Sequence, residues 1–191
     1  VEALRSRYGA TVIGHDKDAT RLPPLDRAVG EGDTMALGET EARVIDVSGH
    51  TVGHIAFVCD AAKAAFTADS LMALGCGRVF EGTHAQMWES LKKLMALPDD
   101  TRIYSGHNYG MANGRFASTI EPSNQALKDR IARIEAANNA GEPIVPVTLA
   151  EELATNPFLR AGEPTVKQAV GLPGGDDAAV FAEIRRRKDA F

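Results

Sequence analysis

The sequence Ser-Gly-His-Thr-Val-Gly-His at residues 48–54 places His50 directly after an apolar run that is typical of a strand. Asp69 in Phe-Thr-Ala-Asp-Ser and His107 in Ser-Gly-His-Asn-Tyr follow apolar runs in the same way. Loops at strand ends carry functional side chains on a rigid scaffold. Taken singly, each of these side chains is typical of a turn or helix cap. Three in the same setting favour a shared site.

The chemistry of these three side chains indicates a metal site. Imidazole and carboxylate groups suit borderline divalent ions such as zinc, and a carboxylate can bridge two ions. Asp69 is therefore the expected bridge between His50 and His107. Two ions close together can produce a hydroxide near neutral pH and polarise the carbonyl it attacks, as thioester or amide hydrolysis requires. We expect His54 to support a ligand from behind rather than to bind metal.

The first half of the chain predicts a sheet with one helix packed on it. Thr83 and Gln86 form a capping-box pair that opens this helix, whose apolar residues from Met87 to Met95 follow helical spacing. Five β-rich runs separated by turns are expected as strands: 10–14, 35–47, 54–59, 64–67 and 102–105.

The second half predicts helices only. Apolar residues from Leu127 to Ala137 mark an amphipathic helix, Thr148 with Glu151 opens another, and a last helix covers 177–188. We therefore expect an α/β domain over residues 1–109 and an all-α domain over 110–191, joined by the segment 110–114 and sharing an interface. Ligand sites often lie at such junctions.

Composition narrows the cellular setting. The 191 residues carry a formal net charge of −5, which gives no electrostatic reason to expect nucleic acid or an anionic membrane as a partner. Cys59 and Cys76 form no CxxC pair, so a reducing compartment and a cytoplasmic location are expected. Each cysteine is predicted to be packed rather than nucleophilic. No apolar run approaches the roughly 20 residues needed to cross a bilayer.

Several longer motifs resemble one enzyme family across essentially the whole chain. Gly-His-Thr-Val-Gly-His (49–54), Gly-Cys-Gly-Arg-Val-Phe-Glu-Gly-Thr (75–83), Ser-Gly-His-Asn-Tyr (105–109), Asn-Pro-Phe-Leu-Arg (156–160) and Arg-Arg-Lys-Asp-Ala-Phe (186–191) are similar to the glyoxalase II family of hydroxyacylglutathione hydrolases. The histidine motif is shared widely among metallo-β-lactamase-fold hydrolases. The Gly-Cys-Gly loop together with the basic C-terminus is far narrower.

The resemblance implies an αββα metallo-β-lactamase fold with a helical C-terminal domain that binds glutathione. It implies hydrolysis of an S-2-hydroxyacylglutathione, typically S-D-lactoylglutathione, to glutathione and a 2-hydroxy acid by a metal-activated hydroxide. It also implies two divalent ions, with zinc as the first expectation and iron or manganese as alternatives. His50 would bind one ion, His107 the other, and Asp69 would bridge them.

The same resemblance assigns residues to the glutathione substrate. Arg78 and Tyr109 would contact the tripeptide, and Arg185 with Lys188, one helical turn apart, would reach its anionic glycine end. Without the resemblance, the two basic residues would indicate only a helix C-terminus favoured by the dipole. Phe80 stands where many relatives have a tyrosine, so one hydrogen bond to the substrate is expected to be absent.

One family motif is absent. The His-x-His-x-Asp-His element, which supplies four further metal ligands and would lie shortly before Val1, occurs nowhere in the chain. We therefore expect the fold to be incomplete at its N-terminus and the chain alone to be inactive or nearly so. Two alternatives stay open: a glutathione-persulfide dioxygenase with one iron, and a non-catalytic glutathione-binding module. The oligomeric state is left open.

Overall fold

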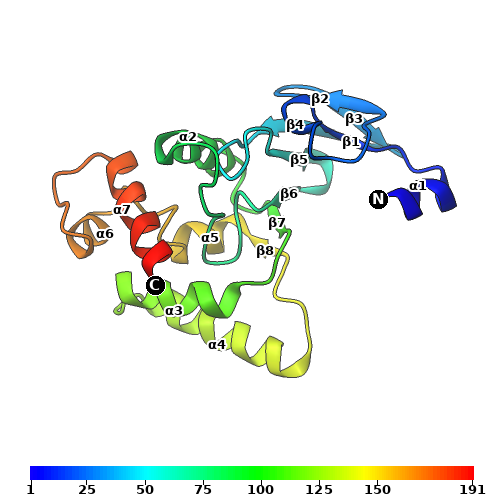
Figure 1. Cartoon of the computed structure of the whole chain (residues 1–191). Helices are drawn as coiled ribbons and strands as arrows, with labels where there is room; N and C mark the ends of the chain where they lie inside the picture. The colour runs from blue at the N-terminus through cyan, green and yellow to red at the C-terminus, as the bar shows by residue number, and fades with distance from the viewer.

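A six-stranded sheet forms the centre of the structure, a computed structural model that describes residues 1–191 (Figure 1). Neighbouring strands are antiparallel except for the parallel pair β6–β7. In spatial order the strands are β3 (Thr34–Leu37), β4 (Thr40–Asp46), β5 (Ile55–Cys59), β6 (Ala64–Ala68), β7 (Arg102–Ser105) and β8 (Val147–Thr148).

The single strand predicted over residues 35–47 is instead a hairpin. Leu37 pairs with Thr40, and Gly38 between them has a φ of 63°, which glycine adopts without strain. The glycine therefore reverses the chain and divides the apolar run into β3 and β4.

The N-terminal segment has few buried residues. Helix α1 (Glu2–Tyr8) buries none, and β1 (Ile13–His15) pairs in parallel with β2 (Arg27–Val29) in a separate two-stranded sheet. Strand β2 was not predicted, because only Val29 of its three residues is buried. Two short 3-10 turns, η1 (Asp16–Asp18) and η2 (Asp60–Ala62), complete this half.

The predicted helices are present, and each begins at a side-chain cap. Thr83 accepts the Gln86 N–H at the start of α2 (His84–Met95), and Thr148 forms a full capping box with Glu151. The helices after residue 109 are α3 (Gly110–Ile120), α4 (Gln125–Ala140), α5 (Leu149–Thr155), α6 (Pro164–Ala169) and α7 (Asp177–Ala190).

The expectation of a connecting segment at 110–114 was wrong, because these residues begin α3. A Cβ at Gly110 would lie 2.5 Å from Ile144 Cδ1, and one at Gly114 would lie 2.9 Å from Ile131 Cγ1. These glycines therefore allow α3 to approach α4 and the segment after it, rather than giving the chain freedom to bend. Strand β8 also departs from an all-helical second half, since it pairs with β7 at the sheet edge.

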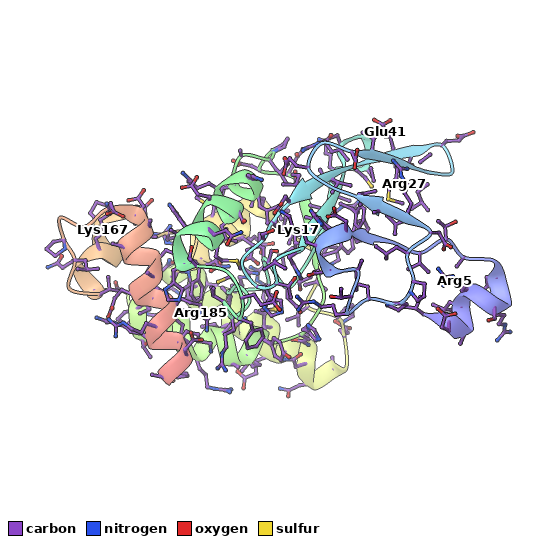
Figure 2. All side chains as sticks on the ribbon, turned by 45° about the horizontal axis from the view of Figure 1, so that its top comes forward. Arg5, Lys17, Arg27, Glu41, Lys167 and Arg185 are labelled. Atoms are coloured by element: carbon purple, nitrogen blue, oxygen red, sulfur yellow. The ribbon has the colours of Figure 1, made fainter.

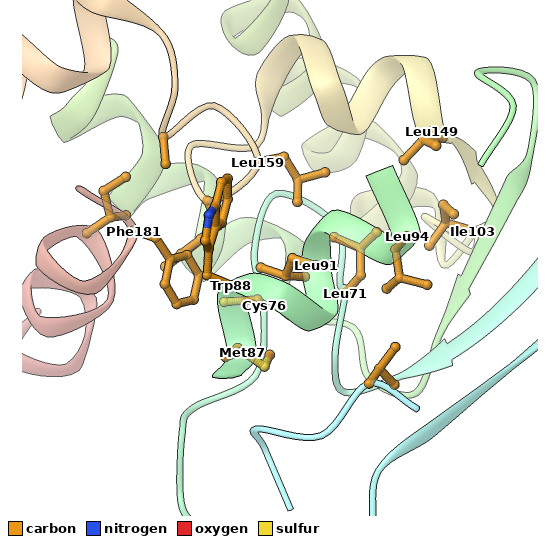
Figure 3. Packing of buried hydrophobic residues seen from close by; sticks show 14 of the residues in the cluster. Leu71, Cys76, Met87, Trp88, Leu91, Leu94, Ile103, Leu149, Leu159 and Phe181 are labelled. Atoms are coloured by element: carbon orange, nitrogen blue, oxygen red, sulfur yellow. The ribbon is translucent and has the colours of Figure 1, made fainter. Parts of the chain in front are cut away.

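One large core connects the two halves. It comprises 24 buried residues and includes Ile103 of the sheet, Leu91 of α2 and Phe181 of α7. Trp88 packs against Phe181 with ring centroids 5.7 Å apart (Figure 3). The division proposed at residue 110 thus separates two sequence segments whose buried side chains pack together. No helix is long and apolar enough to pass through a lipid bilayer.

Candidate active site

A cavity of about 450 Å³ contains every residue predicted to touch metal or substrate. One end holds His50, Asp69 and His107, which we call the histidine end. The other end, which we call the arginine end, is marked by Arg185 and Lys188 of α7. The remaining predicted residues on its wall are Arg78, Phe80 and Tyr109.

A larger cavity of about 660 Å³ lies between the start of α4 and α6. It contains no histidine, and its arginine, Arg160, is already paired with Glu121 through both carboxylate oxygens. Size alone therefore does not identify the reactive site, and the smaller cavity carries the chemistry.

Strand ends bring the three side chains of the histidine end together. Asp69 follows β6 and His107 follows β7, and the carboxyl ends of these parallel strands meet at one edge of the sheet. The Asp69 carboxylate lies between the two imidazoles. His107 Nδ1 donates to Asp69 Oδ1 at 2.6 Å, and His50 Nε2 lies 3.5 Å from Asp69 Oδ2.

Backbone geometry aims Asp69 into the cavity. A register shift interrupts the β6–β7 pairing between Phe66 and Ala68, and Ala68 has a φ of 44°, in the left-handed region that a side chain rarely adopts. Gly77 packs against the same place, because its Cβ would lie 2.4 Å from Asp69 O and 2.9 Å from His50 Nδ1. A glycine is therefore required where the Gly-Cys-Gly loop passes the histidine end.

The orientation of the His50 ring fits a metal ligand. Its Nδ1–H donates to the carbonyl oxygen of Arg78 at 2.7 Å, so the lone pair is on Nε2, the nitrogen that faces Asp69. The donor types suit divalent ions. However, no group of three or more His, Cys, Asp or Glu side chains is arranged as a formed metal site. The residues present thus match part of a ligand set.

His54 lies behind the histidine end and does not line the cavity. Its Nε2 accepts the backbone N–H of Asp69 at 3.1 Å, and its Nδ1 is 3.2 Å from Thr51 Oγ1. Burial, followed by the nearby His50, lowers the pKa of His54. His54 thus holds the Asp69 backbone from outside the cavity, and the supporting role expected for it stays a prediction.

At the arginine end, Arg185 is only 4% exposed although it carries a charge. Its guanidinium donates to Cys76 O at 3.0 Å and lies 5.0 Å from the centre of the Phe158 ring. Nε and the second terminal nitrogen donate to Asp189 Oδ1 at 3.1 and 2.8 Å. Figure 2 shows Arg185 on the side of α7 that faces the rest of the molecule.

Sequence reasoning missed Asp189, which joins both sides of the arginine end. It also accepts from Arg78 Nε at 3.3 Å. The sequence feature that could have identified Asp189 is its position four residues after Arg185, because side chains four residues apart lie on the same face of a helix. Lys188 donates to Ala112 O at 3.0 Å, and burial, followed by Arg185, lowers the pKa of Lys188.

The two aromatic residues on the cavity wall cover the histidines. The Phe80 ring lies 5.1 Å from His50 and the Tyr109 ring stacks 5.4 Å from His107, centroid to centroid. Both remain accessible, with Phe80 64% exposed. Cys76 is buried, and burial raises its pKa to about 11, which leaves it protonated at neutral pH and unsuited to nucleophilic attack.

Comparison with known proteins now identifies the family. Residues 1–107 match the profile of the metallo-beta-lactamase superfamily, and residues 108–191 match that of the hydroxyacylglutathione hydrolase C-terminus. A hydroxyacylglutathione hydrolase of Ruegeria pomeroyi is 60% identical over 189 residues, which cover 99% of this chain and 74% of that protein. The chain belongs to the hydroxyacylglutathione hydrolase family.

Other members of the hydroxyacylglutathione hydrolase family show similar agreement. One from Cereibacter sphaeroides is 58% identical over 191 residues, covering all of this chain and 75% of that protein. Among solved structures, ETHE1 from Myxococcus xanthus aligns with a TM-score of 0.61 at 25% identity, covering 97% of this chain and 61% of that one. The αββα metallo-β-lactamase fold and the helical C-terminal region inferred from the sequence are thereby confirmed, as is membership of the family.

Proposed function

We propose that the cavity hydrolyses S-2-hydroxyacylglutathione thioesters, with S-D-lactoylglutathione as the typical substrate, to glutathione and a 2-hydroxy acid. The observation that carries the proposal is that one cavity joins an imidazole–carboxylate–imidazole set to a cluster of cations. A glutathione thioester combines an electrophilic carbonyl with terminal carboxylates, so it matches both ends. The hydroxyacylglutathione hydrolases at 52–60% identity support the same activity.

His50, Asp69 and His107 would hold the divalent ions, with Asp69 between the two histidines. We propose two ions, with zinc first and iron or manganese as alternatives, because all three accept imidazole and carboxylate donors. Such ions supply Lewis acidity, which polarises the thioester carbonyl and lowers the pKa of the attacking water. The Arg78 carbonyl would orient His50, and the hydrogen bond from the Asp69 N–H to His54 would orient Asp69.

The arginine end would hold the peptide part of the substrate. Arg185 has five N–H donors, and Asp189 and Cys76 engage four of them, counting the weak contact to Cys76 Sγ, so one donor remains for a substrate carboxylate. Lys188 and Arg78 add positive charge on the same wall. Tyr109 would contact the tripeptide from the same wall, where Phe80 would lie beside it without a hydrogen bond.

The direct test is to measure hydrolysis of S-D-lactoylglutathione and metal content together. We would assay this chain and the same chain joined to the remaining quarter of the Ruegeria pomeroyi relative. Hydrolysis with two bound ions in the joined protein supports the proposal. A single iron, with activity on glutathione persulfide and none on lactoylglutathione, would favour the dioxygenase alternative. Glutathione binding without metal and without turnover would favour the binding module.

Glutathione binding by Arg185 has its own test. Arg185→Lys keeps the charge but loses the planar fork that matches a carboxylate, so calorimetry should show binding weakened about 10-fold. Arg186→Lys is the matched control, because the Arg186 side chain is 69% exposed and pairs with Glu183 away from the cavity. Equal loss in both variants would refute the assignment. We also propose a cytoplasmic location, supported by the two unpaired thiols.

A further inference from the structure

A chain of hydrogen bonds leads from the N-terminal segment to the centre of the histidine end. Asp18, at the end of η1, accepts from Thr51 Oγ1 through Oδ2 at 2.9 Å. Thr51 Oγ1 is 3.2 Å from His54 Nδ1, and His54 Nε2 accepts the backbone N–H of Asp69 at 3.1 Å. Three bonds thus connect a buried carboxylate to a residue 51 positions later.

Each bond in this chain has only one possible direction. The Asp69 N–H can only donate, so His54 Nε2 carries its lone pair and Nδ1 carries the hydrogen. Nδ1–H must then donate to Thr51 Oγ1, and the single hydroxyl hydrogen of Thr51 goes to Asp18. An ionised carboxylate only accepts hydrogen bonds. Asp18 is therefore the final acceptor in this series of hydrogen bonds.

Packing holds Asp18 in this position. The residue is 6% exposed, and a Cβ at Gly53 would lie 2.7 Å from Asp18 Cγ. Its second oxygen, Oδ1, makes no hydrogen bond and has an Arg21 guanidinium nitrogen 3.3 Å away. Arg21 also pairs with Glu81, which accepts the Val52 N–H at 2.8 Å. The turn at η1 is therefore joined to the 50–54 loop by contacts on both sides.

We propose that Asp18 is a positioning residue for the histidine end: through Thr51 it stabilises the His54 tautomer that accepts the Asp69 N–H, and so it holds the backbone of Asp69 in place. Asp18 touches neither substrate nor the candidate ligands and acts through Thr51 and His54. The His54 tautomer follows from the hydrogen-bond geometry alone. Its consequence for metal binding rests on the proposed function.

Asp18→Asn tests the directions of these hydrogen bonds, because the Arg21 guanidinium determines how the new amide is oriented. The amide NH2 avoids the guanidinium near Oδ1 and so turns toward Thr51, where it donates. The Thr51 hydrogen then points to His54 Nδ1, which moves the imidazole hydrogen to Nε2, opposite the Asp69 N–H. Two donors would face each other, and the contact should break.

Long-range ¹⁵N–¹H NMR of the histidine rings in the full chain reads the tautomer directly. We expect hydrogen on Nδ1 of His54 in the unmodified chain and a shift toward Nε2 in Asp18→Asn. Thr51→Val should weaken the Nδ1 preference, because the Asp69 N–H is then the only group that favours it, and Thr51→Ser should retain it, because serine keeps the hydroxyl. Asp16→Asn is the control, since the Asp16 side chain is 73% exposed and does not contact Thr51.

A folded Asp18→Asn or Thr51→Val with an unchanged tautomer would overturn the proposal, as would hydrogen on Nε2 in the unmodified chain. If Asp18→Asn does not fold, the comparison of Thr51→Val with Thr51→Ser tests the proposal. Zinc affinity, measured by competition with a chromophoric chelator, should fall about 10- to 100-fold in Asp18→Asn and Thr51→Val but not in Thr51→Ser. Unchanged affinity despite a shifted tautomer would refute positioning of the ligands. Absence of zinc binding in every chain would instead count against the proposed metal site.

Discussion

The histidine end and the arginine end of the cavity differ in what holds their side chains. His50, Asp69 and His107 extend from loops after strands, and the His107 side chain is 54% exposed. Arg185 extends from α7 and is nearly buried, with its guanidinium 5.0 Å from the Phe158 ring centre. Backbone turns and hydrogen bonds therefore position the first end, whereas the second is held both by hydrogen bonds and by packing on an aromatic core. Changes to the core should disturb folding, and changes to the loops should disturb chemistry.

Phe181→Ala should have the largest effect and tests the aromatic core. Phe181 is fully buried and lies 5.7 Å from Trp88 and 5.9 Å from Phe158, centroid to centroid. Its truncation should lower the free energy of unfolding by about 3 to 5 kcal/mol, measured by urea denaturation. Phe80→Ala, at an exposed phenylalanine, should change it by less than about 0.5 kcal/mol. Two separate unfolding transitions would contradict a core shared by both halves.

Asp69→Asn should act on chemistry with little effect on folding. A supporting contact behind a metal ligand contributes about 10- to 100-fold, so loss of the shared carboxylate should lower hydrolysis by at least about 100-fold in the joined protein described above. Metal content should fall in parallel. Asp60→Asn serves as the control, because Asp60 pairs with Arg43 far from the cavity. Retained metal and activity in Asp69→Asn would remove the histidine end from the mechanism.

The free energy of unfolding should fall at alkaline pH because the Cys76 thiol beside the arginine end is buried. The pKa of Cys76 is raised from 9.0 to about 11 by burial, so between these values the unfolded chain loses this proton and the folded chain keeps it. Stability from this group is therefore complete below pH 9 and declines as pH rises toward 11. By pH 10 the loss should be about 1 kcal/mol. In Cys76→Ala the free energy of unfolding should decline less steeply between pH 8 and pH 10 than in the unmodified chain. Equal slopes in the two proteins would contradict the prediction.

Phe80→Tyr should have the smallest effect. The ring is 64% exposed and lies beside His50, so an added hydroxyl costs little in folding and can donate to the substrate. One such hydrogen bond is worth about 0.5 to 1.5 kcal/mol, which corresponds to KM falling by roughly 2- to 10-fold. kcat should stay constant if the bond is made equally in ground and transition states. An unchanged KM would show that a hydroxyl at position 80 does not reach the substrate.

Local signals predicted most elements well. The capping pairs at Thr83 and Thr148 marked helix starts correctly, because a cap depends on residues within one turn. The segment 110–114 was expected to join two domains and instead begins α3, because glycines that allow close helix packing have no distinctive pattern in sequence. Strand β8 was missed because two residues of pairing with β7 leave no periodic pattern.

The residues of the candidate site also differ in whether a local sequence signal identified them. Sequence motifs indicated the residue types at 50, 69 and 107 and the basic residues near the C-terminus, because each motif lies within a few consecutive residues. The domain limits and the roles of individual site residues stay predictions. Asp189 and Asp18 were not identified, since the first matters only when α7 meets the Gly-Cys-Gly loop and the second only when η1 meets Thr51.

By itself, the order of amino acids determined the local elements, the donor chemistry and the family resemblance, all of which depend on near neighbours along the chain. Tertiary structure alone decided that His50, Asp69 and His107 converge, that Arg185 is buried, and that a carboxylate at position 18 reaches the histidine end. The physical reason is that hydrogen bonds and desolvation act over a few ångströms, and only folding brings residues dozens of positions apart within that range.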